Sequence, residues 1–231
     1  MTERKEATMP QLRVHNLTIS LDGYAAGPGQ RREEPLGVGG ERLHEWMLRT
    51  RGARERLGRT DGEEGTDDAF WRRGNEGIGA TIMGRNMFGP VRGPWPDDSW
   101  TGWWGDEPPY HHPVFVLTHH ARPSVAMEGG TVFHFVTDGI GAALARAFDA
   151  AGGEDVRLGG GASTIGAYLR AGLVDEMHVT IAPILLGGGE RLFDQIGPGL
   201  GYECAELTSS PSVVHARFRK VAPSGPPITI P

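Results

Sequence analysis

The chain is poor in cysteine, in lysine and in long apolar runs, and each scarcity excludes a class of protein. Its single cysteine, Cys204, excludes an internal disulfide and any zinc or iron–sulfur site built from several cysteines. Lysine occurs only as Lys5 and Lys220, which argues against Schiff-base, pyridoxal phosphate and P-loop chemistry because each needs a lysine inside its site. No apolar run approaches the roughly 18 residues that a membrane-spanning helix needs.

The charge of the chain points to a small-molecule partner. A net charge of −6 argues against a nucleic-acid partner, because phosphate backbones are bound by basic surfaces. Residues 1–10 are polar and of mixed charge, without the apolar segment of a secretion signal. We therefore expect a cytoplasmic protein that binds a small molecule and neither nucleic acid nor a membrane.

Apolar patterning along the chain predicts a single α/β domain over residues 1–231. Strands separated by helices predict a mainly parallel sheet, to which the last two strands add an antiparallel edge. Residues 1–10 and 220–231 are expected to be tails, and residues 28–77 and 90–113 loop-rich insertions, with 52–77 the least ordered part. The expected strands are 12–21, 80–83, 114–118, 131–136, 156–158, 177–185, 202–207 and 213–219, and the expected helices are 41–51, 138–151 and 162–171.

A run of three glycines carries the most chemical information. Strand 156–158 leads into Gly159, Gly160 and Gly161, and a helix begins directly after them. Glycines let backbone N–H groups approach a ligand closely, and the start of a helix presents further N–H groups and a positive dipole end. The pattern is typical of a pyrophosphate cradle, although a tight turn that binds nothing gives the same local sequence.

Two other expected strands end in residues suited to the same ligand. Gly84, Arg85 and Asn86 follow one strand, and Thr118 and His119 follow another. In an open α/β sheet, ligands bind beyond the carboxyl ends of the strands, so these residues are expected to lie together. Arg85 and Thr118 would hold an adenosine 2′-phosphate there. A Rossmann site is disfavoured, because the early glycines at 37–40 do not follow a strand.

Two further features have open interpretations. Four tryptophans between residues 95 and 104 would form a lid over the substrate, a dimer contact or a cluster packed on the sheet. The histidine pairs at 111–112 and 119–120 suggest a metal site. However, neighbouring residues of a strand point to opposite faces, so a single site could use at most one histidine of each pair. We therefore expect no metal.

Several motifs together resemble the dihydrofolate reductase superfamily, and in particular its branch related to the C-terminal reductase domain of riboflavin biosynthesis. The resemblance covers roughly residues 12–27 and 78–218. It rests on the segments Ser20–Gly27 (SLDGYAAG), Ile82–Asn86 (IMGRN), Val116–Thr118 (VLT), Leu158–Ser163 (LGGGAS) and Ala182–Gly189 (APILLGGG). It implies a dihydrofolate-reductase-like three-layer αβα fold, an NADPH-dependent oxidoreductase and a homodimer.

The resemblance also implies roles for individual residues. Transfer of hydride from NADPH to a C=N or C=O group of a small heterocyclic acceptor, pterin- or aminopyrimidine-like, is the implied reaction. The implied NADPH-binding residues are Ile19, Ala25, Gly84, Arg85, Asn86, Thr118, His119, Leu158, Gly160, Gly161, Ala162, Ser163 and Thr164. Thr180 matches a threonine that faces the substrate in dihydrofolate reductases.

The acceptor and the proton donor are less well defined. The first-helix stretch that carries the pterin-binding acid in dihydrofolate reductases here contains His44, Glu45 and Trp46, with no clear acid at the matching position. These three residues are candidates for substrate binding. Asp22 is the expected catalytic proton donor, with His44 and Glu45 as further candidates, although an Asp-Gly pair also serves as a plain turn. The alternative functions are a non-catalytic nucleotide-, pterin- or flavin-binding protein, and a specialised-metabolism reductase acting on another imine or carbonyl.

Overall fold

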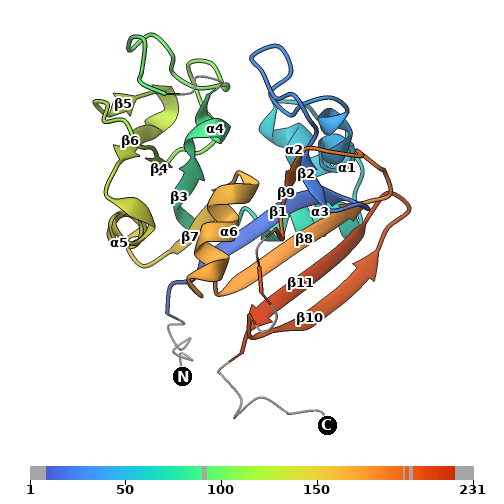
Figure 1. Ribbon diagram of the computed structural model, residues 1–231. Coiled ribbons are helices and arrows are strands. Elements are labelled where there is room, and N and C mark those ends of the chain that lie inside the picture. Colours follow the sequence, from blue (N-terminus) through green and yellow to red (C-terminus); the bar gives the residue numbers. More distant parts are fainter. Residues whose placement is uncertain (1–8, 90–92, 195, 198–199, 222–231) are drawn as a thin grey trace, which may run out of the picture.

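The computed structural model describes residues 9–89, 93–194, 196–197 and 200–221, and shows one large sheet with helices on both faces (Figure 1). The strand order within it is β10-β11-β8-β1-β7-β3-β4-β6-β5. The strands are β1 (Leu12–Ser20), β3 (Ile78–Gly84), β4 (Pro113–Leu117), β5 (Val125–Ala126), β6 (Val132–Val136), β7 (Asp155–Gly160), β8 (Glu176–Ala182), β10 (Tyr202–Ser209) and β11 (Val214–Lys220).

The sheet is mainly parallel, as the sequence predicts. All neighbours from β8 to β6 pair in parallel, while β11 and β10 form an antiparallel edge and β5 pairs antiparallel with β6. A second, two-stranded sheet joins β2 (Tyr24–Ala26) to β9 (Glu190–Arg191). This small sheet links two of the motifs found in the sequence, because β2 follows the turn after β1 and β9 follows the loop after β8.

Alternation along the strands divides the sheet into two differently covered faces. On β8, Met177 and Val179 pack in the main core with α5 (Gly139–Ala151) and α6 (Ala162–Arg170). The residue between them, His178, points to the opposite face. There Phe70 of α3 (Thr66–Arg73) stacks on the His178 ring, with ring centroids 4.7 Å apart. Helices therefore cover both faces, which gives the expected three layers.

The second face is also covered by short helices before α3 and by an aromatic segment. The short helices are η1 (Gly40–His44), α1 (Glu45–Arg49) and α2 (Arg51–Arg56). Trp95, Trp100 and Trp104 pack with Phe88 of α4 (Arg85–Phe88) and with Phe133 of β6 over the β3–β4–β6 part of the sheet. A further 3-10 turn, η2 (Glu128–Gly130), precedes β6. The structure thus shows that these three tryptophans pack on the sheet.

The prediction that residues 52–77 are the least ordered part is wrong. Phe70 and Trp71 of α3 are buried. The buried carboxylate of Asp68 accepts a hydrogen bond from the Gly52 amide and from Arg72. The many charges that suggested disorder are used in ion pairs across the helices, such as Arg72 with Glu55.

Smaller differences from the predicted elements have local causes. The helix expected at 41–51 is broken into η1, α1 and α2, because Thr50 has an extended backbone and caps α2 by accepting from the Ala53 amide. Asp138 precedes α5 but pairs with Arg146 instead of capping the helix. Of the predicted tails, residues 1–8 and 222–231 lie outside the described residues, as do residues 90–92 of the second insertion. Within the described ranges, no helix combines the length and hydropathy needed to cross a membrane.

Candidate functional site

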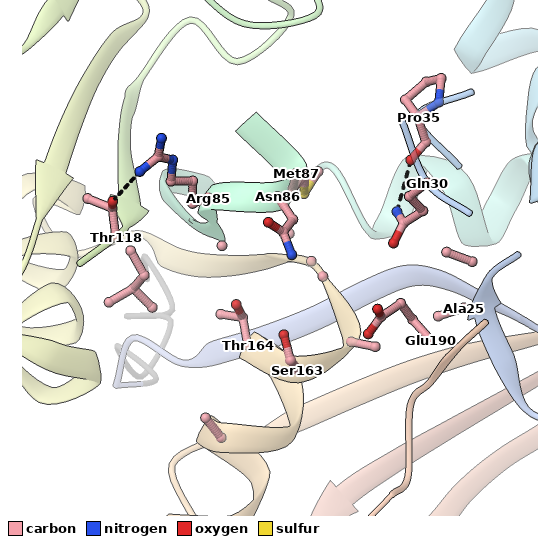
Figure 2. A pocket seen from close by; sticks show the side chains of 18 of the residues that line it. Ala25, Gln30, Pro35, Arg85, Asn86, Met87, Thr118, Ser163, Thr164 and Glu190 are labelled. Atoms are coloured by element: carbon pink, nitrogen blue, oxygen red, sulfur yellow. Dashed lines mark hydrogen bonds between the residues drawn. The ribbon is translucent and has the colours of Figure 1, made fainter. Parts of the chain in front are cut away.

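A cavity of about 880 Å³ lies at the carboxyl ends of the parallel strands. The last residues of β3, β4, β6 and β7 all contribute to its wall, through Gly84, Leu117, Val136 and Gly160. Parallel strands that end at one edge place their following loops together, which is where α/β proteins bind ligands. Figure 2 shows the cavity as a trough that runs from Arg85 and Thr118, past Ser163 and Thr164, to Ala25, Gln30 and Glu190.

At one end of the trough, a cation and a hydroxyl lie side by side. The Arg85 guanidinium donates a hydrogen bond to Thr118 Oγ1 over 3.4 Å (Figure 2). The same guanidinium stacks on the Trp95 indole, with its central carbon 3.4 Å from the ring centroid. Arginine with a neighbouring hydroxyl is suited to a phosphate monoester. This end is therefore suited to a phosphate group.

The middle of the trough is the start of α6. The helix begins at Ala162 after Gly161, with no side chain capping its first turn. The first N–H groups of a helix have no hydrogen-bond partner within the helix, and the positive end of the helix dipole lies at the same place. Both attract an anion. A Cβ on Gly161 would meet nothing within 4 Å, whereas a Cβ on Gly84 would come within 2.3 Å of Thr164 Oγ1. Gly84 thus brings β3 against the helix, and Gly161 leaves the cradle open.

The wall of the trough also contains a histidine, an amide and two tryptophans. His44 and Gln30 line it, and the Gln30 side-chain amide donates to the Pro35 carbonyl over 2.9 Å. Trp103 and Trp104 are further wall residues, and Trp104 also stacks on Phe133 of β6. His44 Nδ1 is buried and has no hydrogen-bond partner among the described residues. Burial lowers the pKa of His44, and the Gly40 carbonyl offsets this only in part. His44 is therefore a neutral imidazole near neutral pH in the wall of the trough.

Twelve of the eighteen residues expected from the sequence line this cavity. They come from five separate segments of the chain: Ala25, His44, Gly84, Arg85, Asn86, Thr118, His119, Gly160, Gly161, Ala162, Ser163 and Thr164. The other six lie elsewhere: Ile19 and Leu158 in the main core, Trp46 and Thr180 buried under the helices, Glu45 exposed on α1, and Asp22 in the β1–β2 turn.

Asp22 joins two loops. Its carboxylate oxygens accept from the backbone amides of Leu186 and Gly187 over 3.1 and 2.7 Å. A hydrogen bond with Ser20 and these two amides lower the pKa of Asp22 to about 2. The side chain therefore carries no proton near neutral pH and holds the turn after β1 against the loop after β8.

Thr180 and Trp46 belong to a buried polar cluster under α1–α3. The Trp46 indole donates to Thr18 Oγ1 over 2.8 Å. Thr180 Oγ1 lies 3.3 Å from His178 Nε2, which is 3.0 Å from His215 Nδ1, and His215 Nε2 is 2.9 Å from Asp67. We call the last four side chains, Thr180, His178, His215 and Asp67, the histidine chain.

The histidine chain is consistent only with neutral rings. The amide of Asn16 donates to His178 Nδ1, so the proton of His178 lies on Nε2 and is donated to His215 Nδ1. Burial lowers the pKa of His178 to about 2 and also lowers that of His215. A second proton on either ring would place two N–H groups against each other. The cluster is thus a closed set of hydrogen bonds in the protein interior.

The four histidines considered for a metal serve other purposes. His112 bonds to Thr81 and His111 to the Gly129 carbonyl, while His119 and His120 line the cavity. Among the residues that the structure describes, no group of three histidine, cysteine, aspartate or glutamate side chains is placed to hold a metal ion.

Some cavity residues were missed by the sequence analysis. Val136 ends β6 and Thr137 follows it at the same edge, so the strand-end argument could have found them. Gln30, Pro35 and Leu36 come from a loop with no recognisable motif, and nothing local marks them. Trp103 and Trp104 were noted, but only the fold shows that they also form part of the cavity wall.

Known proteins share short segments and the fold of this chain. Riboflavin biosynthesis protein RibD of Bacillus amyloliquefaciens is 36% identical over 75 residues, which are 32% of this chain and 18% of that protein. The uncharacterised protein YyaP of Bacillus subtilis is 49% identical over 41 residues, 18% of this chain and 22% of that protein. The matches therefore span about a fifth of each relative.

Solved structures match over nearly the whole chain. A structure described as a riboflavin biosynthesis protein from Shewanella sp. PV-4 has a TM-score of 0.57 at 22% identity, covering 93% of this chain and 100% of that one. A pyrimidine reductase-like protein from Corynebacterium diphtheriae has a TM-score of 0.51 at 17% identity, covering 92% of each. The model of the RibD C-terminal domain matches residues 13–216, so this chain belongs to the RibD C-terminal domain family.

Proposed function

We propose that the protein is an NADPH-dependent reductase that transfers hydride to a C=N or C=O group of a small pterin- or aminopyrimidine-like heterocycle. One observation carries the proposal: a single trough joins an arginine–hydroxyl pair, an uncapped helix start, two tryptophans and a neutral histidine. Membership of the RibD C-terminal domain family supports a reductase of this kind.

The residues along the trough fit the successive parts of NADPH in order. Arg85 and Thr118 would hold the 2′-phosphate, and the first turn of α6 the pyrophosphate, because both offer N–H or O–H donors in a wall without carboxylates at these points. The backbone near Ile19 and Ala25 would hold the nicotinamide. When bound, NADPH supplies the hydride, and the protein supplies orientation and a proton.

The acceptor would lie in the same trough, whose wall includes the flat apolar rings of Trp103 and Trp104 and the amide of Gln30. Among the candidates for the proton step we favour His44. It lines the trough, whereas the Asp22 carboxylate is occupied by two amides and Glu45 is exposed on α1. A small-molecule reductase acting as a homodimer in the cytoplasm completes the proposal.

The test is consumption of NADPH, followed at 340 nm, with a panel of dihydropterins, aminopyrimidines, imines and quinones. We expect turnover with at least one flat nitrogen heterocycle. NADPH that binds but is not oxidised with any member would favour a nucleotide-binding protein without catalysis. Turnover confined to the quinones or to simple imines would instead favour a specialised-metabolism reductase.

A further inference from the structure

Trp95 lies under the one cation that the proposed function assigns to the cofactor phosphate. The central carbon of the Arg85 guanidinium is 3.4 Å from the centroid of the Trp95 ring, which is a stacking contact. A guanidinium over an indole face is attracted by the ring quadrupole, and tryptophan gives the strongest such contact. The stacked guanidinium also reaches Thr118 Oγ1 at the cavity wall.

The Trp95 ring is itself firmly held. Its indole N–H donates to the His120 carbonyl over 2.9 Å. Phe88 and Phe135 contact it edge-to-face, with centroids 6.0 and 5.3 Å away. The Arg122 guanidinium lies 4.9 Å from its centroid. Trp95 is therefore a fixed platform in the aromatic layer over β4 and β6.

Arg122 ties the rest of the segment to the same layer. Its side chain is 1% exposed, and it donates to a carboxylate oxygen and to the carbonyl of Asp98 over 3.2 and 2.7 Å. The stretch that carries Trp95 is thus also anchored at Asp98, three residues after the ring. An arginine that is stacked before binding loses less side-chain freedom when it engages a phosphate than one that must first be ordered.

We propose that Trp95 is a specificity-determining positioning residue, which gives the site its preference for the 2′-phosphorylated dinucleotide by holding Arg85 beside Thr118. The inference rests on the proposed function, because it concerns the same cofactor. The inference goes beyond the proposed function because it assigns the preference for the 2′-phosphate to a side chain that carries no charge. The ring acts through Arg85, so its loss should affect only ligands that bear the 2′-phosphate.

The test compares NADP⁺ with NAD⁺, which differ by that phosphate alone, in calorimetric titrations of four proteins. Trp95→Leu should weaken NADP⁺ binding about 10-fold and leave NAD⁺ binding unchanged, since a half-buried cation–π contact contributes about one such factor. Trp95→Phe, which keeps an aromatic face, should lose less. Trp100→Leu is the matched control: its indole N–H donates to the Phe88 carbonyl and its ring packs on Trp103, and it should show no selective loss for NADP⁺.

Each outcome decides the inference. Equal losses of affinity for both dinucleotides in Trp95→Leu would show that Trp95 has a merely structural role. Unchanged NADP⁺ affinity would show that Trp95 has no role in cofactor binding. Either result overturns the inference while the wild-type preference for NADP⁺ keeps the proposed function intact. A wild-type protein that binds neither dinucleotide would overturn both. If Trp95→Leu does not fold, the ratio of NADP⁺ to NAD⁺ affinity in Trp95→Phe decides in the same way.

Discussion

Polar side chains gather in two regions of this protein, and the two regions use them in opposite ways. Around the trough, Arg85, Thr118 and the first turn of α6 line a cavity. Under α1–α3, the histidine chain bonds to itself, and His178, Thr180 and His215 are completely buried. The difference shows that the surroundings of a polar strand residue decide its role. Where the edge of the sheet is open, the residue lines a binding site. Where helices cover the face of the sheet, it stabilises the interior.

The largest expected effect breaks the closed region with acid. The pKa of buried His178 is lowered to about 2 in the folded protein but is near 6.5 when unfolded, so its contribution is complete above pH 6.5 and is lost as pH falls. Between pH 6.5 and 4 the free energy of unfolding should fall by about 3 kcal/mol from this group alone. Urea denaturation at pH 7.5, 6, 5 and 4 measures it.

A carboxylate extends the loss to lower pH. Burial alone would raise the pKa of Glu176, but hydrogen bonds with His15 and Arg217 lower it to about 2, so its contribution is lost below about pH 4.5. His178→Gln should be less stable at pH 7 and should show a shallower dependence between pH 6.5 and 4. A free energy of unfolding that stays flat from pH 7 to 4.5 would contradict the closed, neutral histidine chain.

The next effect separates two candidates for the proton step, His44 in the wall of the trough and Asp22 in the turn after β1. His44→Gln should lower kcat about 100-fold with little change in NADPH affinity, which is the usual loss when a general acid is removed. In the wild type, kcat should fall as pH rises through a pKa below 6.5, because burial lowers the pKa of His44 and only the protonated ring donates.

Asp22→Asn is the matched variant. It keeps the size of the side chain but removes the charge that accepts from the Leu186 and Gly187 amides. We expect a lower melting temperature and a change in kcat of no more than a few-fold. A kcat loss in Asp22→Asn that exceeds the loss in His44→Gln would return the proton step to Asp22.

A pair of glycines sharpens the account of the open region. Gly84→Ala places a Cβ against Thr164 Oγ1 and should cost about 1–3 kcal/mol of stability, as overpacking does. Gly161→Ala meets no atom within 4 Å, so stability should change by less than about 1 kcal/mol while NADPH affinity falls. Thermal unfolding and calorimetric titration of both variants measure the two effects. Unchanged NADPH affinity in Gly161→Ala would mean that the cradle lies elsewhere.

The open region was the more predictable of the two from sequence. Gly84, Thr118 and Gly160 directly follow apolar runs that read as strands, and parallel strands bring their ends to one edge whatever the details of packing. Short-range pattern and topology were therefore sufficient to bring these strand-end residues of the trough together. The same reasoning would have included Thr137, which directly follows a fourth strand, β6.

The closed region depends on contacts between distant residues, which local pattern does not contain. Thr180 and Trp46 were expected at the substrate, but Trp46 bonds to Thr18 and Thr180 to His178 beneath helices that the charge-rich sequence of residues 52–77 did not suggest. Trp95 was part of a segment with open interpretations, and only the fold shows that it stacks on Arg85. Side chains that act through others are identified by packing, which the sequence does not display.

The central claim is that the trough binds a 2′-phosphorylated dinucleotide through Arg85. The most direct measurement is calorimetric titration of wild type and Arg85→Gln with NADPH and with NADH. Removing one charged partner of a phosphate costs about 2 kcal/mol or more, so NADPH affinity should fall at least about 30-fold in Arg85→Gln, to near that of NADH, while NADH affinity stays the same. Equal affinity of the wild type for both dinucleotides, or an unchanged preference in Arg85→Gln, would contradict the account.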